Sequence, residues 1–393
     1  MNHSLAMILL LGASPAAAAV LPSTPATFAA VFANAKGGDT IKLAPGDYGT
    51  VITFRSKPIA FTPPLTIDAS AKGVTATSMF FENFSGLVLQ GPNITGDATT
   101  RSGLQFTKAS NIVVNDATVA NALRSGIGIS MSDNVTVNRA YITKGSSDGI
   151  DISSSKHVVI DTLTCADFVP STGAHADCVQ GYSSGGQYAP DPLSYITVKN
   201  SLAVGNSTGN AQLQGFDMFG NRIPADHIDF SNNIAMVTSY WGFSMTDSEA
   251  APCRDCTFLN NKAYTMQGSI GIIKVNPLAT TPNWTGKISG NSGNSARPPA
   301  LRASYEPDRH LPAGQALKVA HALTAANQTL DVEAGADLAP WKRRLDATGP
   351  FPVSISGRVY LCTAVNPRQH SIGLSQTVRP ADAATGATIL VLP

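Results

Sequence analysis

The chain has 393 residues, with 27 lysines and arginines against 26 aspartates and glutamates, so its formal net charge at pH 7 is +1. Only 13% of the residues are charged, about half the usual share for a soluble domain, and this balance argues against a nucleic-acid partner. With 43% apolar residues the chain can bury a sizeable core, which excludes disorder throughout, and its five cysteines are too few for a disulfide-built scaffold.

The first 19 residues have the pattern of a secretory signal peptide. A short apolar stretch, residues 6–12, is followed by small residues that end in an Ala-x-Ala pattern near Ala19. No later apolar run approaches the roughly 18 residues of a membrane span. We therefore expect export to the periplasm or the extracellular space, and no stable membrane insertion.

Residues 20–297 repeat one short pattern, in which apolar and polar residues alternate with period two. Successive copies start 23 residues apart where no insertion intervenes. Because the copies alternate like strands and lack a helical stripe, we predict an all-β fold, a right-handed parallel β-helix with one copy per coil. The clearest copies start at Asn111, Asn134, His157, Tyr195, His227 and Asp255, and weaker copies start at Asp39, Pro64 and Gly86.

Stacking the copies predicts three columns of residues that point into the solenoid. The first column is Ile112, Val135, Val158, Ile196, Ile228 and Cys256; the second is Val114, Val137, Ile160, Val198, Phe230 and Phe258; the third is Val119, Ile142, Cys165, Ala203, Ala235 and Ala263. At the turn we expect Asn200, Asn232 and Asn260 to form a ladder of amides that bond coil to coil.

A second strand precedes each copy, and its outward residues line up in two further columns. One column contains Gly128, Asp151, Gln180, Asp217, Ser244 and Lys274, and a neighbouring column contains Asp148, Asp177, Gln214 and Trp241. The longest insertions of the chain follow the His157 copy, and such loops rim the face of a solenoid where binding usually lies.

This strip suits an extended sugar chain, because amides and carboxylates bond hydroxyl groups and aromatic rings stack on pyranose faces. We therefore predict substrate-binding roles for Asp151, Gln180, Gln214, Asp217, Trp241 and Tyr182.

The repeat stops near residue 298. Residues 298–310 are predicted to be a linker, and residues 311–393 a small β-rich C-terminal module. The module resembles a short β module attached to phage and adhesin-like proteins.

The segments SSDGIDI, residues 146–152, and ADC, residues 176–178, resemble motifs of the polygalacturonase family of glycoside hydrolases. Those motifs read Asn-Thr-Asp-Gly-(Ile/Phe)-Asp and Asp-Asp-Cys, so the resemblance implies that Asp148 and Asp177 are catalytic and that Lys274 matches the lysine of an Arg-Ile-Lys motif. The chain departs from the family at Ala176, which replaces the general-acid aspartate, and at Ile272, which replaces the arginine, and it has no Gly-His-Gly motif.

The segment HADCVQ, residues 175–180, is also similar to the His-Pro-Asp-x-Ile-Gln pattern of exported bacterial β-helix proteins grouped near polysaccharide lyases. The resemblance implies the pectin-lyase-like superfamily. A lyase needs a base, and it needs a cation, amide or protonated acid that neutralises the uronate carboxylate. His175 and Lys274 are the candidate bases. Asp177 and Gln180, together with a calcium ion bound by Asp151 and Asp177, are the candidates for the second role.

We therefore predict an exported enzyme that cleaves an anionic, uronate-containing polysaccharide by β-elimination. Two alternatives stay open at this point: a polygalacturonase-like hydrolase with Asp148 and Asp177 as its carboxyl pair, and a non-catalytic carbohydrate-binding or adhesin-like protein. A disulfide between Cys165 and either Cys178 or Cys253 is compatible with the sequence.

Overall fold

The computed structural model describes residues 18–53, 58–97, 99–170, 176–183, 191–205, 213–220, 223, 225–237, 242–247, 254–265, 273–276, 287–294, 316–323, 327–334, 336, 338–348, 351–356 and 358–391. Within these ranges the secondary structure is mostly β, and the two helices are α1 (Phe28–Asn34) and α3 (Ala339–Thr348). Neither helix is long and apolar enough to cross a membrane.

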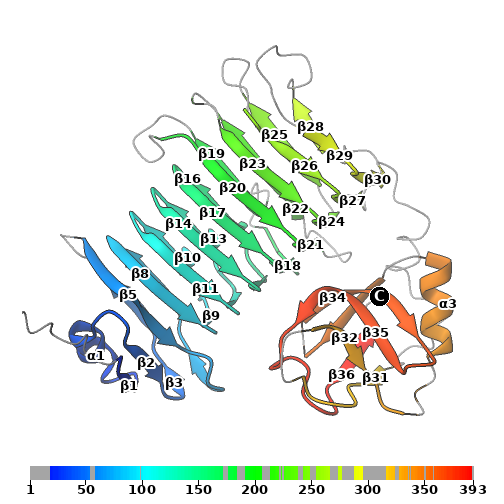
Figure 1. The fold of residues 1–393 in the computed structure, drawn as a ribbon, viewed down its shortest axis with the longest axis horizontal. Coiled ribbons are helices and arrows are strands. Elements are labelled where there is room, and N and C mark those ends of the chain that lie inside the picture. Colours follow the sequence, from blue (N-terminus) through cyan, green and yellow to red (C-terminus); the bar gives the residue numbers. More distant parts are fainter. Residues whose placement is uncertain are drawn as a thin grey trace, which may run out of the picture.

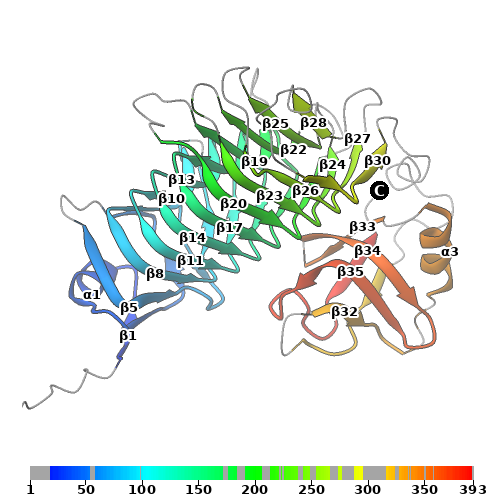
Figure 2. The ribbon, with the colours of Figure 1, turned by 45° about the horizontal axis from the view of Figure 1, so that its top comes forward.

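Three parallel sheets wind around one long core and form a parallel β-helix (Figures 1 and 2). The described part of each full coil contributes one strand to each sheet, so a coil has three strands. Helix α1 covers the N-terminal end of the core, where its Phe32 packs against Phe81 and Phe84. The all-β solenoid predicted from the repeat is confirmed.

The 11-stranded sheet contains β1 (Val20–Ser23), β2 (Thr40–Leu43), β5 (Ile59–Asp68), β8 (Phe84–Gln90), β11 (Ser110–Asn115), β14 (Asp133–Asn138), β17 (Lys156–Asp161), β20 (Ser194–Lys199), β23 (Asp226–Ser231), β26 (Thr257–Leu259) and β29 (Lys287–Ser289). The 9-stranded sheet contains β4 (Thr50–Thr53), β7 (Ser78–Glu82), β10 (Ser102–Thr107), β13 (Ser125–Ser130), β16 (Asp148–Ser153), β19 (Ala176–Ser183), β22 (Leu213–Gly220), β25 (Phe243–Asp247) and β28 (Ile273–Asn276). The 8-stranded sheet contains β9 (Asn93–Thr95), β12 (Thr118–Ala120), β15 (Tyr141–Thr143), β18 (Thr164–Ala166), β21 (Leu202–Val204), β24 (Ile234–Val237), β27 (Lys262–Thr265) and β30 (Ser292–Asn294). The short strands β3 (Gly46–Asp47) and β6 (Val74–Thr75) pair with each other.

The three inward columns form the core of the solenoid as predicted. In the first column Val135 pairs with Ile112 on one side and with Val158 on the other, and all three side chains are fully buried. The third column runs down the 8-stranded sheet, where Ile142 pairs with Cys165 and Cys165 with Ala203. Because side chains alternate along a strand, a slip of one residue would turn a whole column outward, so this burial fixes the register of each coil.

The predicted asparagine ladder is confirmed at Asn200, whose amide donates to Asp161 Oδ1 of the previous coil at 2.9 Å. Asn200, Asn232 and Asn260 take left-handed backbone conformations, with φ of 54°, 57° and 55°, where the chain turns out of the 11-stranded sheet. Asparagine is one of the few residues that tolerate this region. These three asparagines therefore serve the backbone of the turn.

A second, buried ladder of amides that bond coil to coil consists of the residues that follow, namely Asn233 and Asn261, and of Asn291. The Asn233 side chain is fully buried, donates to the Val198 carbonyl at 2.8 Å, and accepts from the Ser201 backbone amide at 2.9 Å. These bonds satisfy backbone groups that the turn removes from the sheet ladder.

The C-terminal module is a separate antiparallel sheet with its own core around Trp341. It docks beside the 8-stranded sheet, where Gln376 donates to the Leu163 carbonyl at 2.9 Å and Leu361 packs near Tyr141. Its strands are β31 (Ala316–Lys318), β32 (Asn327–Asp331), β33 (Phe351–Ile355), β34 (Arg358–Asn366), β35 (Ser371–Val378) and β36 (Thr388–Val391). The predicted linker and residues 1–17 of the predicted signal peptide lie outside the described residues, so these boundaries stay predictions.

The buried ladder gives a first prediction. Replacing Asn233 by alanine leaves the Ser201 amide and the Val198 carbonyl buried without a partner, at a cost of about 1–3 kcal/mol for each orphaned group. The urea midpoint of N233A, followed by circular dichroism, is therefore expected to fall clearly below that of the parent protein. The control is N138A, which removes an amide that bonds to Asn115 on the outer surface of the 11-stranded sheet. Equal midpoints for N233A and N138A would contradict the role assigned to the ladder.

Candidate functional site

The outer surface of the 9-stranded sheet carries the polar column predicted from the sequence. The backbone register pairs Asp151 with Gln180, Gln180 with Asp217, and Ser244 with Lys274. The complete column is Gln105, Gly128, Asp151, Gln180, Asp217, Ser244 and Lys274. One strip of sheet therefore holds residues that are far apart in the sequence.

A second polar column lies three residues earlier in the same strands, and simple alternation would place it on the opposite face. Two consecutive inward residues prevent this. Ile150 is fully buried, and a Cβ atom added to Gly149 would lie 2.7 Å from the sulfur of Cys165, inside the solenoid. Asp148 and Asp151 on either side of this pair both lie on the outer face. The second column consists of Ser102, Ser125, Asp148, Asp177 and Gln214.

Asp148 and Asp177 form a buried carboxyl pair on adjacent strands. Asp148 is 6% exposed and Asp177 is fully buried, and the Asp177 backbone amide donates to Asp148 Oδ1 at 3.0 Å. Burial, followed by the neighbouring charge of Asp177, raises the pKa of Asp148 to about 8. Asp148 therefore keeps its proton at neutral pH and can act as an acid or as a neutral hydrogen-bond donor.

Asp151 is the third carboxyl group of the cluster. Its side chain is largely buried, and burial raises its pKa to about 6, although the nearby Arg124 guanidinium acts in the opposite direction. Arg124 Nη2 lies 3.5 Å from Asp151 Oδ2. On the neighbouring strand, the Gln180 amide donates to Asp177 Oδ2 at 3.0 Å. The cluster thus combines a protonated acid, carboxylates, an amide and a cation within three successive coils.

A cavity of about 970 Å³ runs along the sheet from the first coils to the carboxyl cluster. Its volume lies within the range of about 300–1,000 Å³ that is typical of ligand pockets. Most of the residues that line it are polar or charged, and the lining includes Thr50, Ser78, Phe80, Asp97, Arg101, Ser102, Gln105, Arg124, Ser125, Gly128, Ile129, Met131, Asp151, Ser153 and Tyr182. An elongated ligand would therefore reach Asp151 from the N-terminal side.

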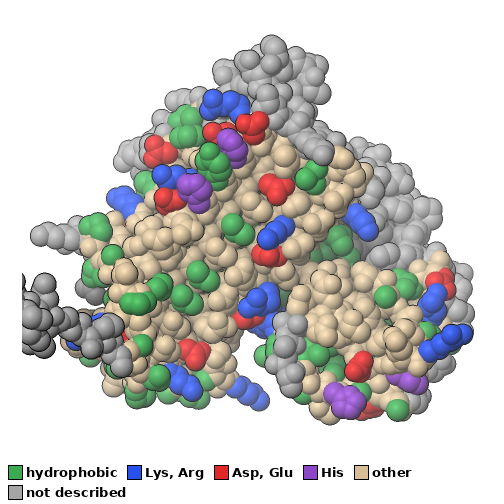
Figure 3. Space-filling model, in the orientation of Figure 1, with side chains coloured by type: hydrophobic (Ala, Val, Ile, Leu, Met, Phe, Trp, Pro, Cys, Tyr) green, Lys and Arg blue, Asp and Glu red, His purple; other side chains and the backbone are tan. Residues whose placement is uncertain are grey.

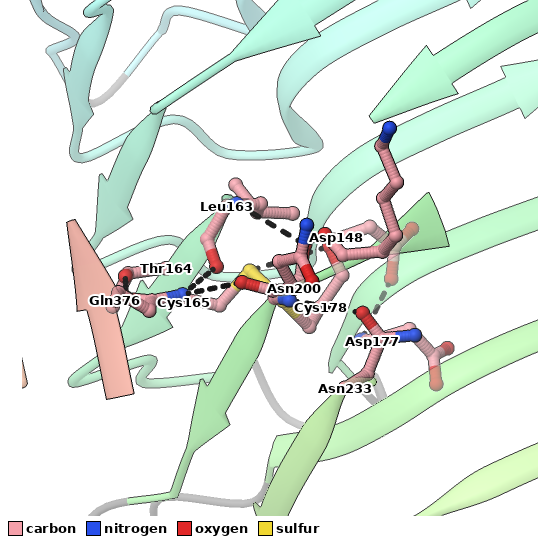
Figure 4. Close-up of a disulfide and its surroundings, with 11 residues drawn as sticks. Asp148, Leu163, Thr164, Cys165, Asp177, Cys178, Asn200, Asn233 and Gln376 are labelled. Atoms are coloured by element: carbon pink, nitrogen blue, oxygen red, sulfur yellow. Dashed lines mark hydrogen bonds between the residues drawn. A yellow bond between two sulfur atoms is a disulfide. The ribbon is translucent and has the colours of Figure 1, made fainter. Parts of the chain in front are cut away.

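A disulfide between Cys165 and Cys178 holds the start of strand β19. Cys165 belongs to the inward column of the 8-stranded sheet, and Cys178 follows Asp177 directly, so the bond crosses the core. In Figure 4 the disulfide lies between the contact of Gln376 with Thr164 on one side and the pair Asp148 and Asp177 on the other. The Cys178 pairing, one of the two considered from the sequence, is confirmed, and it anchors a catalytic candidate directly after a long insertion.

The described residues place six of the predicted site residues in one region. These six are Asp148, Asp151, Asp177 and Gln180 in the cluster, Gln214 beside Asp177, and Tyr182 in the cavity wall. Asp217 pairs with Gln180 on the next strand, further from the cavity.

The remaining three predicted residues are placed in part or not at all. His175 and Trp241 lie outside the described residues, and only the backbone of Lys274 is described. Lys274 stands three strands from Gln180, which is about 14 Å along the column. The register therefore places Lys274 in another part of the strip from the carboxyl cluster.

Sequence reasoning missed Arg101 and Arg124, the two cations of the cavity. Each residue directly precedes a strand of the 9-stranded sheet, and the two are one 23-residue period apart. The Arg124 backbone amide donates to the Arg101 carbonyl at 2.7 Å, so the two positions are stacked. The spacing of one repeat period is a signal that could have found them, although both residues lie just outside the strands that carry the apolar pattern.

Several charged groups outside this site are paired with one another. Figure 3 shows a mostly uncharged solenoid face on which histidine, acidic and basic side chains gather in one area. On the 11-stranded sheet the rings of His157 and His227 stack on either side of Tyr195, and His157 Nδ1 lies 2.7 Å from Asp133. Within the described ranges no group of three or more His, Cys, Asp or Glu side chains is arranged to hold a metal ion.

Comparison with known proteins agrees with this architecture. Residues 102–276 match the family model described as the right handed beta helix region. This part of the chain is a right-handed β-helix. The right-handed parallel β-helix predicted from the repeat is confirmed for these residues, and the matched region includes the whole carboxyl cluster. No curated protein sequence matches the chain.

Solved β-helix structures are similar to this chain in fold. An alginate lyase from Paenibacillus sp. str. FPU-7 is 16% identical, with a TM-score of 0.49 over 71% of this chain and 96% of its own. A structure titled rhamnogalacturonan lyase is 16% identical, with a TM-score of 0.40 over 68% of this chain and 82% of its own. A polygalacturonase from Erwinia carotovora ssp. carotovora is 15% identical, with a TM-score of 0.35 over 74% of this chain and all of its own.

The raised pKa of Asp148 predicts a pH dependence of stability. Folding raises this pKa above its ordinary value of 3.8, so the contribution of Asp148 is fully present below about pH 4 and is lost as the pH rises toward 8. The loss is at most about 1.4 kcal/mol per pH unit. D148N, which cannot titrate, is expected to show a shallower fall of the urea midpoint between pH 4 and pH 8. D133N, altered on the other sheet, serves as the control, and parallel curves for D148N and the parent would contradict the assignment.

The disulfide predicts a second effect on stability. Its two cysteines are 13 residues apart, and closing a loop of this size stabilises a fold by about 3 kcal/mol in the chain-entropy model. The double variant C165A/C178A is expected to unfold at a lower temperature and to exchange the amide hydrogens of β19 faster. C362A, which replaces a buried cysteine of the module, is the control for loss of a cysteine side chain. Unchanged exchange in β19 would show that the bond does not hold this strand.

Proposed function

We propose that this protein is a carbohydrate-active enzyme that cleaves a uronate-containing polysaccharide by β-elimination. The observation that carries the proposal is the buried carboxyl cluster, in which Asp148 keeps a proton beside Asp177, at the end of a cavity that also holds two arginines. The long polar cavity supports a chain-like ligand rich in hydroxyl groups, and its arginines support an anionic one.

The reaction requires two proton transfers. A base removes the proton from the carbon next to the uronate carboxylate, the electron pair forms a carbon–carbon double bond, and the bond to the glycosidic oxygen breaks. The departing oxygen then takes up a proton. Negative charge that develops on the carboxylate must be neutralised for the first transfer to be fast.

The cluster supplies groups for these tasks. The protonated Asp148 and the Gln180 amide can donate hydrogen bonds, and Arg124 provides positive charge beside them. As the base we propose His175, since it precedes Asp177 by two residues in the sequence. Lys274 is the weaker candidate, because its backbone lies about 14 Å along the column from Gln180.

Hydrolysis is the second candidate, because the carboxyl groups Asp148 and Asp177 lie on adjacent strands and burial raises the pKa of Asp148. Inverting hydrolases separate their carboxyl groups by about 6.5–9.5 Å to admit a water molecule. Neighbouring strands are only about 4.8 Å apart. The position of this pair on neighbouring strands therefore argues against inverting hydrolysis.

Calcium has no part in the proposed steps. We propose the steps without calcium, because Arg124 lies beside Asp151 and the described residues include no group of three or more His, Cys, Asp or Glu side chains arranged to hold a metal ion. Export of the protein stays a proposal from the sequence of residues 1–19.

The proposal predicts an unsaturated product. Incubation with polygalacturonate, alginate and other uronate polymers is expected to raise the ultraviolet absorbance that a newly formed double bond conjugated to a carboxylate gives. H175A is expected to lower kcat/KM by about 100-fold or more, because it removes the proposed base. D177N is also expected to lower kcat/KM, because Asp177 accepts a hydrogen bond from the Gln180 amide and its charge helps to raise the pKa of Asp148.

D133N on the 11-stranded sheet is the control and should retain the parent rate. Chain shortening with new reducing ends and no ultraviolet absorbance would support hydrolysis instead. Binding of a polymer without any shortening would identify a carbohydrate-binding protein.

A further inference from the structure

The Arg124 side chain lies where its guanidinium can bind either the carboxylate of Asp151 or a ligand in the cavity. It directly precedes strand β13, its side chain is 51% exposed, and it lines the cavity together with Arg101 from the previous coil. Its separation from Asp151 is 3.5 Å, longer than the 2.7–2.9 Å or so of a strong charge-assisted hydrogen bond. The ion pair is therefore loose enough to exchange for a better acceptor.

Asp151 differs from Arg124 in its exposure, because it is nine-tenths buried. Its Oδ1 atom lies in the wall of the cavity without a hydrogen-bond partner among the described residues. The groups of its own column on the adjacent strands, Gly128 and Gln180, are uncharged. The charged or titratable groups that interact with Asp151 are Arg124 and the carboxyl groups of Asp148 and Asp177.

We propose that Arg124 determines specificity for anionic substrates by exchanging its partner: it leaves Asp151 to bind a substrate carboxylate, and Asp151 takes up a proton from solvent. The inference rests on the proposed function for the anionic nature of the substrate. To the proposed function the inference adds a residue, Arg124, that selects the substrate, and a proton that the protein takes up when the substrate binds.

The exchange follows from charge and burial. An arginine fork binds one carboxylate with two parallel hydrogen bonds, and a substrate carboxylate in the open cavity can accept both. Asp151 would then be a buried carboxylate without its cation, with two other acidic groups nearby, and such a group neutralises itself by binding a proton. Burial already raises the pKa of Asp151 to about 6 while Arg124 is present, so loss of Arg124 moves it further upward.

The test is isothermal titration calorimetry of the full-length protein with trigalacturonate at pH 7, repeated in buffers of different ionisation enthalpy. Fully methyl-esterified trigalacturonate is the neutral probe, and trimannuronate and triguluronate extend the panel. For the parent protein we expect net uptake of a proton, up to one per molecule bound, and much weaker binding of the ester.

Three variants separate the steps. R124Q is expected to bind the anionic trimer at least about tenfold more weakly and without proton uptake, because a charged hydrogen-bonded pair is lost. D151N is expected to bind the trimer without proton uptake. R254Q, which alters an exposed arginine paired with Asp226 on another part of the solenoid, should match the parent in both respects.

The outcomes distinguish this inference from the proposed function. Equal binding of acid and ester, proton uptake that persists in D151N, or failure of every uronate probe to bind would overturn the inference. Formation of unsaturated product without proton uptake would overturn the inference and leave the proposed function standing. Proton uptake that depends on Arg124, without any unsaturated product from the polymers, would support the inference and overturn the proposed elimination.

Discussion

The register of successive coils is the constraint on which the rest of the structure depends. Each coil buries three apolar positions against its neighbours, as Val135 does between Ile112 and Val158. Fully burying one such side chain contributes about 1.5–3 kcal/mol, and the contribution recurs in every coil. A shift by one residue would expose a column and bury polar side chains, so the coils have one favourable alignment. That alignment brings residues about 30 positions apart, such as Asp148 and Asp177, onto adjacent strands.

The chemistry of the candidate site follows from a local departure from this regular pattern. Gly149 and Ile150 both face inward, so two carboxyl groups three residues apart share the outer face. The backbone amide of Asp177 and the disulfide at Cys178 then hold the next coil close to Asp148. Burial, followed by the charge of Asp177, raises the pKa of Asp148 to about 8.

Sequence reasoning predicted the parts of the molecule that repeat. The inward columns and the column from Asp151 to Lys274 follow from a period of 23 residues and from strand alternation, and the coordinates agree with both. Sequence reasoning assigned the amide ladder to Asn232 and missed Asn233. Asn232 takes the left-handed conformation of the turn, and the apolar pattern does not indicate which residue of a turn points inward.

The interactions of the site were harder to predict from sequence than its position. The ion pair between Arg124 and Asp151 could not be predicted, because Arg124 lies in a turn and the hydrophobic pattern does not indicate where the side chain of a turn residue points. The protonation of Asp148 depends on its burial and on Asp177, and neither depth nor distance can be obtained from one sequence. The columns predicted from the sequence nevertheless include Asp148 and Asp151, because the register alone determines which residues are neighbours.

The account depends most directly on the proton held by the carboxyl cluster at neutral pH. Infrared difference spectroscopy of the parent protein against D148N, across a pH titration, observes the carbonyl band of a protonated carboxylic acid. The account predicts that a band assigned to Asp148 is present at pH 7 and disappears only near pH 8. Disappearance of that band near pH 4, as for an ordinary aspartate, would contradict it.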